Sequence, residues 1–284
     1  MKKALLAALI TVLLLLALLR LAPAFLDWQN KSVQVTHYTV SSAEIPPAFD
    51  GYRILLLADI QGFAVDSPRM EELLSEQNGD LMVLAGDLVD NGIAQSEDVI
   101  FRFLQQWGGK LPIYAVSGNH DLWTEGFSEL KEHWEQGGAV RFLENQQTVL
   151  EKDGQQIMLY GISDPDVWDW DQAAERVKQA EESLALQPDC FGILLFHRAN
   201  MLDLLQNDVF DLILSGHMHG GQIRLPFVGG LRSPHGDWFP EYSGGKYQRN
   251  GQTMIVSRGL GNAVSVPRLF NRPELVVITL QTEK

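Results

Sequence analysis

Residues 53–61 read RILLLADIQ, a short apolar run that ends on the acidic residue Asp59. The run is too brief for a helix and shows no polar alternation, which is typical of a strand buried on both faces. Two later stretches repeat the pattern, because residues 81–87 read LMVLAGD and residues 113–121 read IYAVSGNHD. The sequence therefore predicts three buried strands, each of which delivers acids, amides or an imidazole at its end.

Three further apolar runs lie downstream and also end on polar residues. These runs and their polar ends are residues 157–162 with Asp164, residues 192–196 with His197, and residues 212–214 with His217 and His219. Amphipathic stretches at helical spacing separate the strands, for example around residues 70–74 and 99–107. Alternating strands and helices predict an α/β fold, in which ligands bind beyond the carboxyl ends of the strands. We therefore expect one site at these polar ends.

The first thirty residues form a separate segment. After two lysines the chain is almost continuously apolar from residue 4 to residue 26, interrupted only by one threonine and one arginine. At about 1.5 Å per residue, a helix of this length crosses the hydrocarbon core of a bilayer. We therefore predict a signal anchor, or transmembrane segment, in residues 1–30 and one globular domain in residues 31–284.

The charges around this segment predict its orientation. Lys2 and Lys3 favour an amino terminus in the cytoplasm, so the domain would lie on the far side of a cell membrane that the chain crosses once. A secretory signal is the alternative, since Ala22-Pro23-Ala24 offers small residues for cleavage, although proline is unfavourable there. The expected location is the cell membrane with an extracytoplasmic domain, or the exterior after cleavage.

The composition excludes several classes of protein. The formal net charge of -14 is spread along the chain and gives no basic surface, so no nucleic-acid partner is expected. A single cysteine, Cys190, excludes an intrachain disulfide and a cysteine-based zinc site. The 284 residues, 45% of them hydrophobic, suffice for one large domain, and the oligomeric state stays open.

The polar residues at the strand ends form a mixed set of oxygen and nitrogen ligands. Such a set suits Mn, Fe, Zn or a similar divalent ion, and its members are Asp59, Asp87, Asn119, His197, His217 and His219. Asp87 has two carboxylate oxygens and is suited to bridge two cations. Two ions about 3.5 to 4 Å apart would generate a hydroxide nucleophile and bind the phosphoryl oxygens of a substrate.

The order of these residues resembles the signature of the calcineurin-like metallophosphoesterase superfamily. Its blocks here are Asp59 with a ligand two residues on, Gly86-Asp87, Gly118-Asn119-His120-Asp121, His197 and Gly216-His217-x-His219. Further segments resemble the membrane-associated YkuE-like branch, namely residues 220–222, 257–262 and 270–274. The resemblance covers nearly the whole chain. It implies a four-layer αββα sandwich of two mixed β-sheets with helices outside.

The resemblance also implies two metal sites that share Asp87. One site takes Asp59, Gln61 and His219 as its further ligands. The other site takes Asn119, His197 and His217. His120 would lie near the scissile phosphate and protonate the leaving oxygen or stabilise its charge, with Asp121 as the residue that orients it.

Gln61 departs from the usual family pattern, which has histidine at this position. Its amide oxygen is a harder and weaker ligand than imidazole, which favours Mn or Mg over Zn. We therefore expect two divalent metal ions, with Mn first and Fe, Zn or Mg as alternatives. Glutamine also occupies this position in the related manganese-dependent ADP-ribose/CDP-alcohol diphosphatases. A degenerate site is the other interpretation, in which Asp59 and Gln61 only hydrogen-bond the loop and a one-metal binding protein remains.

The expected activity is metal-dependent hydrolysis of a phosphoester or pyrophosphate bond by a metal-activated hydroxide. The substrate class is a phosphoester-containing small molecule or, given the membrane segment, a lipid-linked or cell-wall-linked phosphoester. A nucleotide diphosphatase is one alternative. A non-catalytic metal-binding scaffold at the membrane is the other.

A few remaining residues have no clear pattern in the sequence. His235 is expected to be part of a turn, and a position in the lining of the substrate cleft is the alternative. Trp168 and Trp170 form either an aromatic lip of the site or the cover of a core edge. Candidates for phosphate or substrate contacts, because guanidinium and amide groups suit such binding, are Arg258, Asn262, Arg268 and Arg272.

Overall fold

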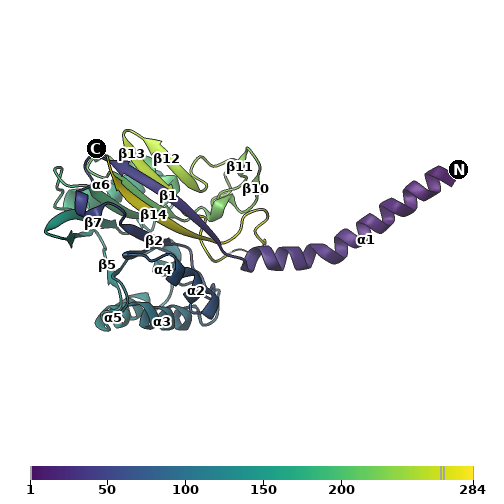
Figure 1. Ribbon diagram of the computed structural model, residues 1–284, viewed down its shortest axis with the longest axis horizontal. Helices are drawn as coiled ribbons and strands as arrows, with labels where there is room; N and C mark the ends of the chain where they lie inside the picture. The colour runs from purple at the N-terminus through teal and green to yellow at the C-terminus, as the bar shows by residue number, and fades with distance from the viewer. Residues whose placement is uncertain (1, 263, 265, 284) are drawn as a thin grey trace.

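Two six-stranded β-sheets pack face to face in the computed structural model, which describes residues 2–262, 264 and 266–283 (Figure 1). The first sheet has the order β1 (Gln34–Ser42), β14 (Glu274–Thr282), β2 (Arg53–Leu57), β3 (Leu81–Ala85), β4 (Ile113–Val116) and β5 (Arg141–Phe142). The second has the order β12 (Gly245–Arg249), β13 (Gln252–Val256), β9 (Leu212–Gly216), β8 (Gly192–Arg198), β7 (Gln155–Ile162) and β6 (Gln146–Lys152). Both sheets are mixed, since β14–β2, β12–β13 and β6–β7 are antiparallel and the other neighbours are parallel.

The middle residues of the central strands are apolar because both faces of these strands are covered. Ile54 and Leu56 of β2 point between the sheets, where they join Leu214 of β9 in one buried cluster. Leu55 and Leu57 point the other way, into a second buried cluster formed with helices. Residues of a strand alternate between its two faces, so burial of both faces leaves no polar position.

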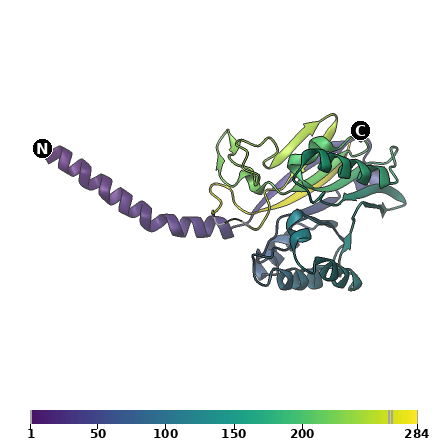
Figure 2. The ribbon, with the colours of Figure 1, turned by 180° about the vertical axis from the view of Figure 1, so that it is seen from behind.

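Helices form the two outer layers of the molecule. The outer face of the first sheet is covered by α2 (Pro68–Glu76), α3 (Ser96–Trp107) and α5 (Phe127–Gln136). The outer face of the second sheet is covered by α6 (Trp170–Ser183) and η2 (Ala199–Leu204), seen from behind in Figure 2. The predicted α/β class and the four-layer αββα sandwich of two mixed sheets are therefore confirmed.

The predicted helical stretches lie in α2 and α3. The N-terminus of α2 is capped by Ser67, whose hydroxyl accepts a hydrogen bond from the Met70 amide, and Pro68 occupies the first turn. Met70, Leu73 and Leu74 form the buried face of this helix. The remaining short elements are η1 (Pro47–Phe49), α4 (Asn119–Trp123), η3 (His219–Gly221), β10 (Arg224–Leu225) and β11 (Gly229–Gly230).

The N-terminal segment is a single helix, α1 (Lys2–Lys31), which projects away from the domain (Figures 1 and 2). It is long and apolar enough to cross a membrane, a property that a signal sequence near the N-terminus shares. The helix continues through Pro23 and ends close to the predicted limit of the anchor.

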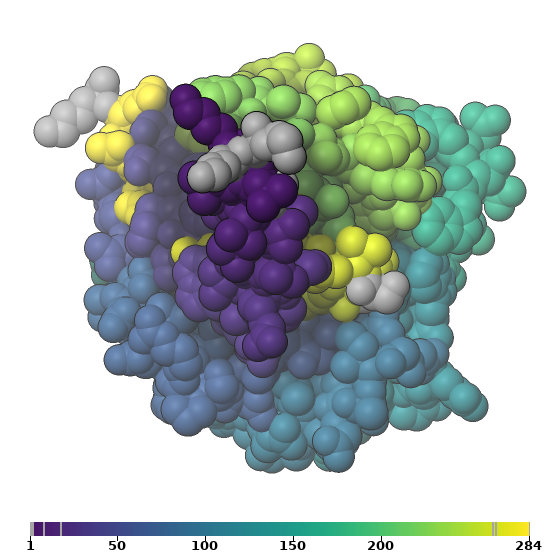
Figure 3. Space-filling model, turned by 90° about the vertical axis from the view of Figure 1, so that its right-hand side faces the viewer, coloured from purple at the N-terminus to yellow at the C-terminus, as the bar shows by residue number. Residues whose placement is uncertain are grey.

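The base of α1 is hydrogen-bonded to the domain. The Gln29 side chain donates to the Arg268 carbonyl at 2.8 Å and accepts from the Phe270 amide at 2.9 Å. The Asn30 side chain donates to the same carbonyl at 3.0 Å and accepts from the Arg268 amide at 2.9 Å. Figure 3 looks along α1 and shows C-terminal residues, in yellow, beside the helix. Gln29 and Asn30, on the anchor side of the predicted boundary, are therefore tied to the C-terminal loop.

Candidate metal centre

The polar ends of strands from both sheets meet at one place. The loop after β2 lies against the loop after β3, because the Asp59 amide donates to the Gly86 carbonyl at 3.0 Å. The loop after β9 joins them, because the His217 amide donates to the two Asp59 carboxylate oxygens at 2.9 and 3.0 Å. The packing of the two sheets and the hydrogen bonds between these loops therefore bring predicted ligands from distant parts of the chain together.

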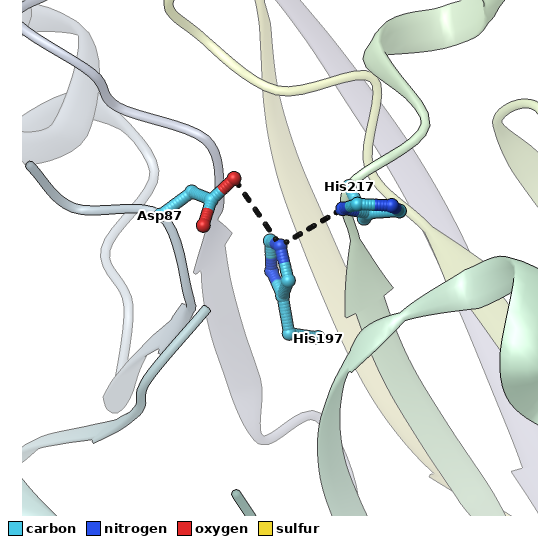
Figure 4. Close-up of side chains that lie close together, drawn as sticks. All are labelled: Asp87, His197 and His217. Atoms are coloured by element: carbon cyan, nitrogen blue, oxygen red, sulfur yellow. Dashed lines mark hydrogen bonds and ion pairs between the residues drawn. The ribbon is translucent and has the colours of Figure 1, made fainter. Parts of the chain in front are cut away.

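One group of predicted ligands is formed by Asp87, His197 and His217 (Figure 4). The Nε2 atom of His197 lies 3.3 Å from Oδ2 of Asp87 and 3.3 Å from Nδ1 of His217. His197 Nδ1 lies 2.7 Å from the carbonyl oxygen of Ala85, to which it donates. This second contact orients the ring and directs Nε2 into the site, as the outer partners of metal-binding histidines do.

A second group is formed by Asp59, Asp87 and His219. Here Nε2 of His219 is 3.7 Å from Oδ1 of Asp59, a looser approach than the distances in the first group. Gln61 joins this side of the site, since its Nε2 donates to Oδ2 of Asp87 at 3.1 Å. Asp87 thus belongs to both groups, the position that a bridging carboxylate would occupy.

Two buried amide oxygens allow a direct test of whether these residues fit metal ions. Oε1 of Gln61 and Oδ1 of Asn119 have no hydrogen-bond partner among the residues that the structure describes. Both side chains are buried, and leaving such an acceptor unpaired costs about 1 to 3 kcal/mol. The backbone around Asn119 is held at Asp87, whose Oδ1 accepts from the His120 amide at 2.8 Å. A cation beside these oxygens would remove the cost, so the residues fit divalent metal ions.

The charges of the buried site also call for cations. Burial raises the pKa of the Asp59 carboxyl to about 7, and the neighbouring charge of Asp87 adds to the rise. Burial alone would lower the pKa of His197, but the charge of Asp87 and the hydrogen bond to it raise the pKa to about 10. A proton on His197 therefore balances the carboxylates in the metal-free protein. A divalent ion would provide this positive charge and displace the proton.

Backbone strain is concentrated at the same residues. Five of the seven predicted ligands have φ between 41° and 73°, and they are Asp59, Gln61, Asp87, His217 and His219. This left-handed region costs a residue with a side chain about 1 to 3 kcal/mol, and such strain accumulates at functional sites. The hydrogen bonds between the loops hold these residues in place despite the cost.

Neighbouring glycines let the loops approach the carboxylates. A Cβ atom on Gly118 would lie 2.2 Å from Oδ1 of Asp87, and one on Gly216 would lie 2.7 Å from Oδ2 of Asp59. Any side chain at these positions would push the carboxylates out of the site.

His120 lies at the site, but its partner differs from the predicted one. Its Nδ1 atom forms an ion pair with Oδ2 of Asp90, a residue that sequence reasoning missed. The Asp121 carboxylate instead accepts three backbone hydrogen bonds at 2.8 to 2.9 Å, from the amides of Leu88, Val89 and Gly118. The prediction that Asp121 orients His120 is therefore wrong, because Asp121 fixes the two loops that carry Asp87 and Asn119. Asp90 follows Asp87 by three residues on the same loop, which was the one indication in the sequence that Asp90 lies at the site.

His235 lies beside the predicted ligand His217, which agrees with the alternative interpretation of this residue and not with a role in a turn alone. Its Nε2 atom lies 2.8 Å from Nε2 of His217, and its ring packs edge-on against Trp168 with centroids 4.7 Å apart. Trp168 is exposed and therefore belongs to the rim of the site, as the lip interpretation expected. Trp170 is exposed at the start of α6.

Of the four candidates for substrate contacts, three have structural partners and one contacts a predicted ligand. Arg258 forms an ion pair with Glu274 at 2.8 Å, and Arg272 bonds to Ser32 at 2.8 Å, so both have structural partners. Asn262 caps its own loop through the carbonyls of Val264 and Val266. Arg268 alone contacts a predicted ligand, with Nη2 at 3.2 Å from Nδ1 of the buried His219.

Comparison with known proteins gives a consistent result. A family model described as calcineurin-like phosphoesterase matches residues 52–221, a range that includes every predicted ligand but neither His235 nor Arg268. The chain is 30% identical over 257 residues to the metallophosphoesterase YkuE of Bacillus subtilis (strain 168), covering 88% of this chain and 86% of that protein. It is 28% identical to YkoQ of the same organism, covering 93% and 97% of the two chains. It is 29% identical to the phosphodiesterase YaeI of Escherichia coli (strain K12), covering 81% and 82%.

Proposed function

The chain belongs to the calcineurin-like phosphoesterase family, and on that premise we propose that it hydrolyses a phosphodiester or pyrophosphate bond at a centre of two divalent metal ions. As a member of this family it is a metallophosphoesterase. The observation that carries the two-metal proposal is the pair of buried ligand groups that share Asp87.

Each proposed metal site combines residues from both sheets. One ion would be held by Asp59, Gln61, Asp87 and His219, and the other by Asp87, Asn119, His197 and His217. When bound, the two ions activate a water molecule for attack and offset the charge of the phosphoryl oxygens. Gln61 favours Mn as the metal, with Fe, Zn or Mg as alternatives, because its amide oxygen is a harder ligand than imidazole.

His120 is the proposed proton donor to the leaving oxygen. Its side chain is 27% exposed, whereas the ligand histidines are buried, so it borders the solvent side of the centre. The carboxylate of Asp90 at Nδ1 orients the imidazole and leaves the other ring nitrogen available for the substrate. Asp90 is therefore the residue that we propose orients His120, in place of Asp121.

We propose further that α1 anchors the protein in a membrane with the domain outside the cytoplasm. Three aromatic side chains lie together at the base of this helix, and we call them the aromatic collar: Phe25, Trp28 and Phe270. These side chains are 39%, 55% and 60% exposed, and aromatic residues at such positions prefer the interface between lipid and water. The hydrogen bonds of Gln29 and Asn30 to the domain fix the collar relative to the metal centre.

A pocket supports a lipid-linked or cell-wall-linked substrate. It has a volume of about 580 Å³ and lies between α1 and the second ligand group, with Leu26, Asn30, Gln61, Phe63 and Arg268 in its lining. A substrate whose lipid part stays in the bilayer would reach Gln61 through this pocket. The phosphodiesterase name of YaeI makes a diester the first bond to test.

The test uses the full chain in detergent, because truncation after residue 30 would remove Gln29 and Asn30. The Mn-loaded protein is assayed with bis-p-nitrophenyl phosphate, p-nitrophenyl phosphate, ADP-ribose and a phospholipid in mixed micelles. We expect the native protein to hydrolyse the diesters in a Mn-dependent reaction. The Asp87→Asn substitution should abolish this hydrolysis. The matched control Asp66→Asn, which changes an aspartate that pairs with Arg102 away from the site, retains the activity.

The same assay separates the alternatives. Fastest turnover of ADP-ribose would support a nucleotide diphosphatase. No turnover of any substrate above the Asp87→Asn background would refute the catalytic proposal and leave a metal-binding scaffold.

A further inference from the structure

We propose that His235 is a positioning residue for the metal ligand His217, holding its ring in the tautomer that presents Nδ1 to the metal. This inference rests on the proposed two-metal function. It concerns a residue outside the range 52–221 that the family model matches, on a loop beyond the predicted ligands.

Both ring nitrogens of His217 have a histidine partner. Nδ1 lies 3.3 Å from Nε2 of His197, and Nε2 lies 2.8 Å from Nε2 of His235. Nε2 of His197 points into the site because its Nδ1 donates to the Ala85 carbonyl. The nitrogen of His217 that faces His197 and Asp87 is therefore its Nδ1, which makes Nδ1 the ligand atom in the first group.

The position of the hydrogen atom follows from this geometry. A neutral imidazole carries one hydrogen, and a nitrogen that binds a metal must present its lone pair. If Nδ1 of His217 is the ligand, the hydrogen is on Nε2 and is donated over 2.8 Å to Nε2 of His235. His235 then accepts through Nε2 and carries its own hydrogen on Nδ1. Ligand histidines usually donate to a carboxylate or a carbonyl, and here a second imidazole takes that place.

The surroundings hold His235 in this orientation. Its ring packs edge-on against Trp168, with an angle of 80° between the ring planes. The guanidinium of Arg198 lies 5.2 Å from the Trp168 ring and is itself fixed by a buried ion pair with Asp164 at 2.6 Å. The loop that carries His235 is closed by Ser233, which accepts a hydrogen bond from the Asp237 amide at 3.0 Å. The imidazole is therefore supported from the side and from its backbone.

The first test measures metal affinity, a readout that does not depend on activity. Full-length metal-free protein in detergent is titrated with Mn²⁺ against a chelator, for the native chain and for His235→Ala and His235→Gln. Loss of an outer partner of a ligand histidine typically weakens metal affinity about 10- to 100-fold. We expect this loss in His235→Ala for one of the two ions only. His235→Gln, which retains a carbonyl acceptor, should recover part of the affinity.

A matched control is His133→Ala. His133 also stacks on an aromatic ring, that of Phe101 at 5.1 Å, but it is exposed and contacts no predicted ligand among the described residues. This variant should bind both ions with native affinity. Unchanged Mn²⁺ affinity in His235→Ala would overturn the proposal. An equal loss of affinity for both ions would also overturn it, since that result indicates a general disturbance of the metal centre. If His235→Ala raises KM for the substrate without changing metal affinity, the residue contacts substrate instead.

A spectroscopic measurement tests the tautomer without any variant. In Zn²⁺-loaded protein with ¹⁵N-labelled histidine, the proposal requires hydrogen on Nε2 of His217 and on Nδ1 of His235. Hydrogen on Nε2 of His235 would overturn it. Metal affinity and the tautomer can be measured even if the phosphodiesterase assay detects no activity. The proposal for His235 and the proposed function can therefore be refuted independently.

Discussion

The two ligand groups of the metal centre share Asp87 but are built differently. In the first, each histidine is oriented by an acceptor, the Ala85 carbonyl for His197 and His235 for His217, and the facing nitrogens are 3.3 Å apart. In the second, an amide replaces one imidazole at Gln61, and Nε2 of His219 is 3.7 Å from Asp59. The histidines of the first group are therefore better oriented for an ion than the residues of the second.

The surroundings of the second group add to this difference. The buried guanidinium of Arg268 lies 3.2 Å from Nδ1 of His219 and brings positive charge to the edge of the site. Burial lowers the pKa of His219 to about 3, and the charge of Arg268 adds to the fall. A second cation close to a fixed guanidinium is bound less tightly, because like charges repel in a buried site. We therefore expect one tightly and one weakly bound ion.

Loss of the shared carboxylate should have the largest effect, because it breaks both sites at once. In Asp87→Asn the amide cannot bridge two cations, and the metal centre provides several kcal/mol of transition-state stabilisation. We expect turnover to fall on the order of a thousandfold or more. Elemental analysis should find less than two ions per chain in this variant. Native turnover with two bound ions would contradict the shared role of Asp87.

Removal of the proton donor should reduce activity while leaving both metal sites intact. We expect His120→Ala to lower turnover by about a hundredfold or more on substrates with alkoxide leaving groups. p-Nitrophenolate needs less protonation, so bis-p-nitrophenyl phosphate should show a much smaller loss. Metal content should remain native. An equal loss for both kinds of leaving group would argue against proton donation by His120.

Gln61→His should make the second ligand group resemble the first, because it adds an imidazole. An imidazole binds Zn, Fe or Mn more tightly than an amide oxygen does. We expect the weaker ion to gain about tenfold in affinity and its preference to move from Mn towards Zn, while the tighter ion is unchanged. Isothermal titration with each metal measures both effects. If neither affinity nor preference moves, Gln61 is not a ligand.

The smallest expected effect concerns the base of α1. A chain that begins at Asp27 keeps Gln29 and Asn30, whereas a chain that begins at Ser32 loses their hydrogen bonds to the loop of Arg268. These bonds lie outside the centre, so we expect an effect on it worth about one hydrogen bond, roughly 1 kcal/mol, and the shorter chain should bind the weaker ion about fivefold less tightly. Mn²⁺ titration of the two truncated proteins checks this. Identical affinities would show that the helix base does not influence the centre.

The residue pattern was sufficient to predict the buried strands, the α/β class and the residues gathered at the strand ends. The apolar runs around Leu56, Leu84 and Leu214 reveal buried strands because both faces of each strand are covered. The polar residue after each run must lie at the edge of a sheet. The four layers came from the resemblance and not from periodicity, and the order of the strands, which decides which loops touch, was not predicted.

The partners of the predicted site residues were harder to predict. Asp90, His235 and Arg268 lie on irregular loops, where no repeating pattern indicates which way a side chain points. Each acts through a contact with a residue far away in the sequence or across a turn. Asp121 shows the converse error, since its position beside His120 in the chain suggested a contact that the turn of α4 prevents.

Titration of the full-length metal-free chain with Mn²⁺ measures the difference between the two ligand groups. We expect two ions per chain, with dissociation constants that differ by about tenfold or more because one group has oriented imidazoles and the other has Gln61 beside Arg268. A single bound ion, or two ions of equal affinity, would contradict this expectation.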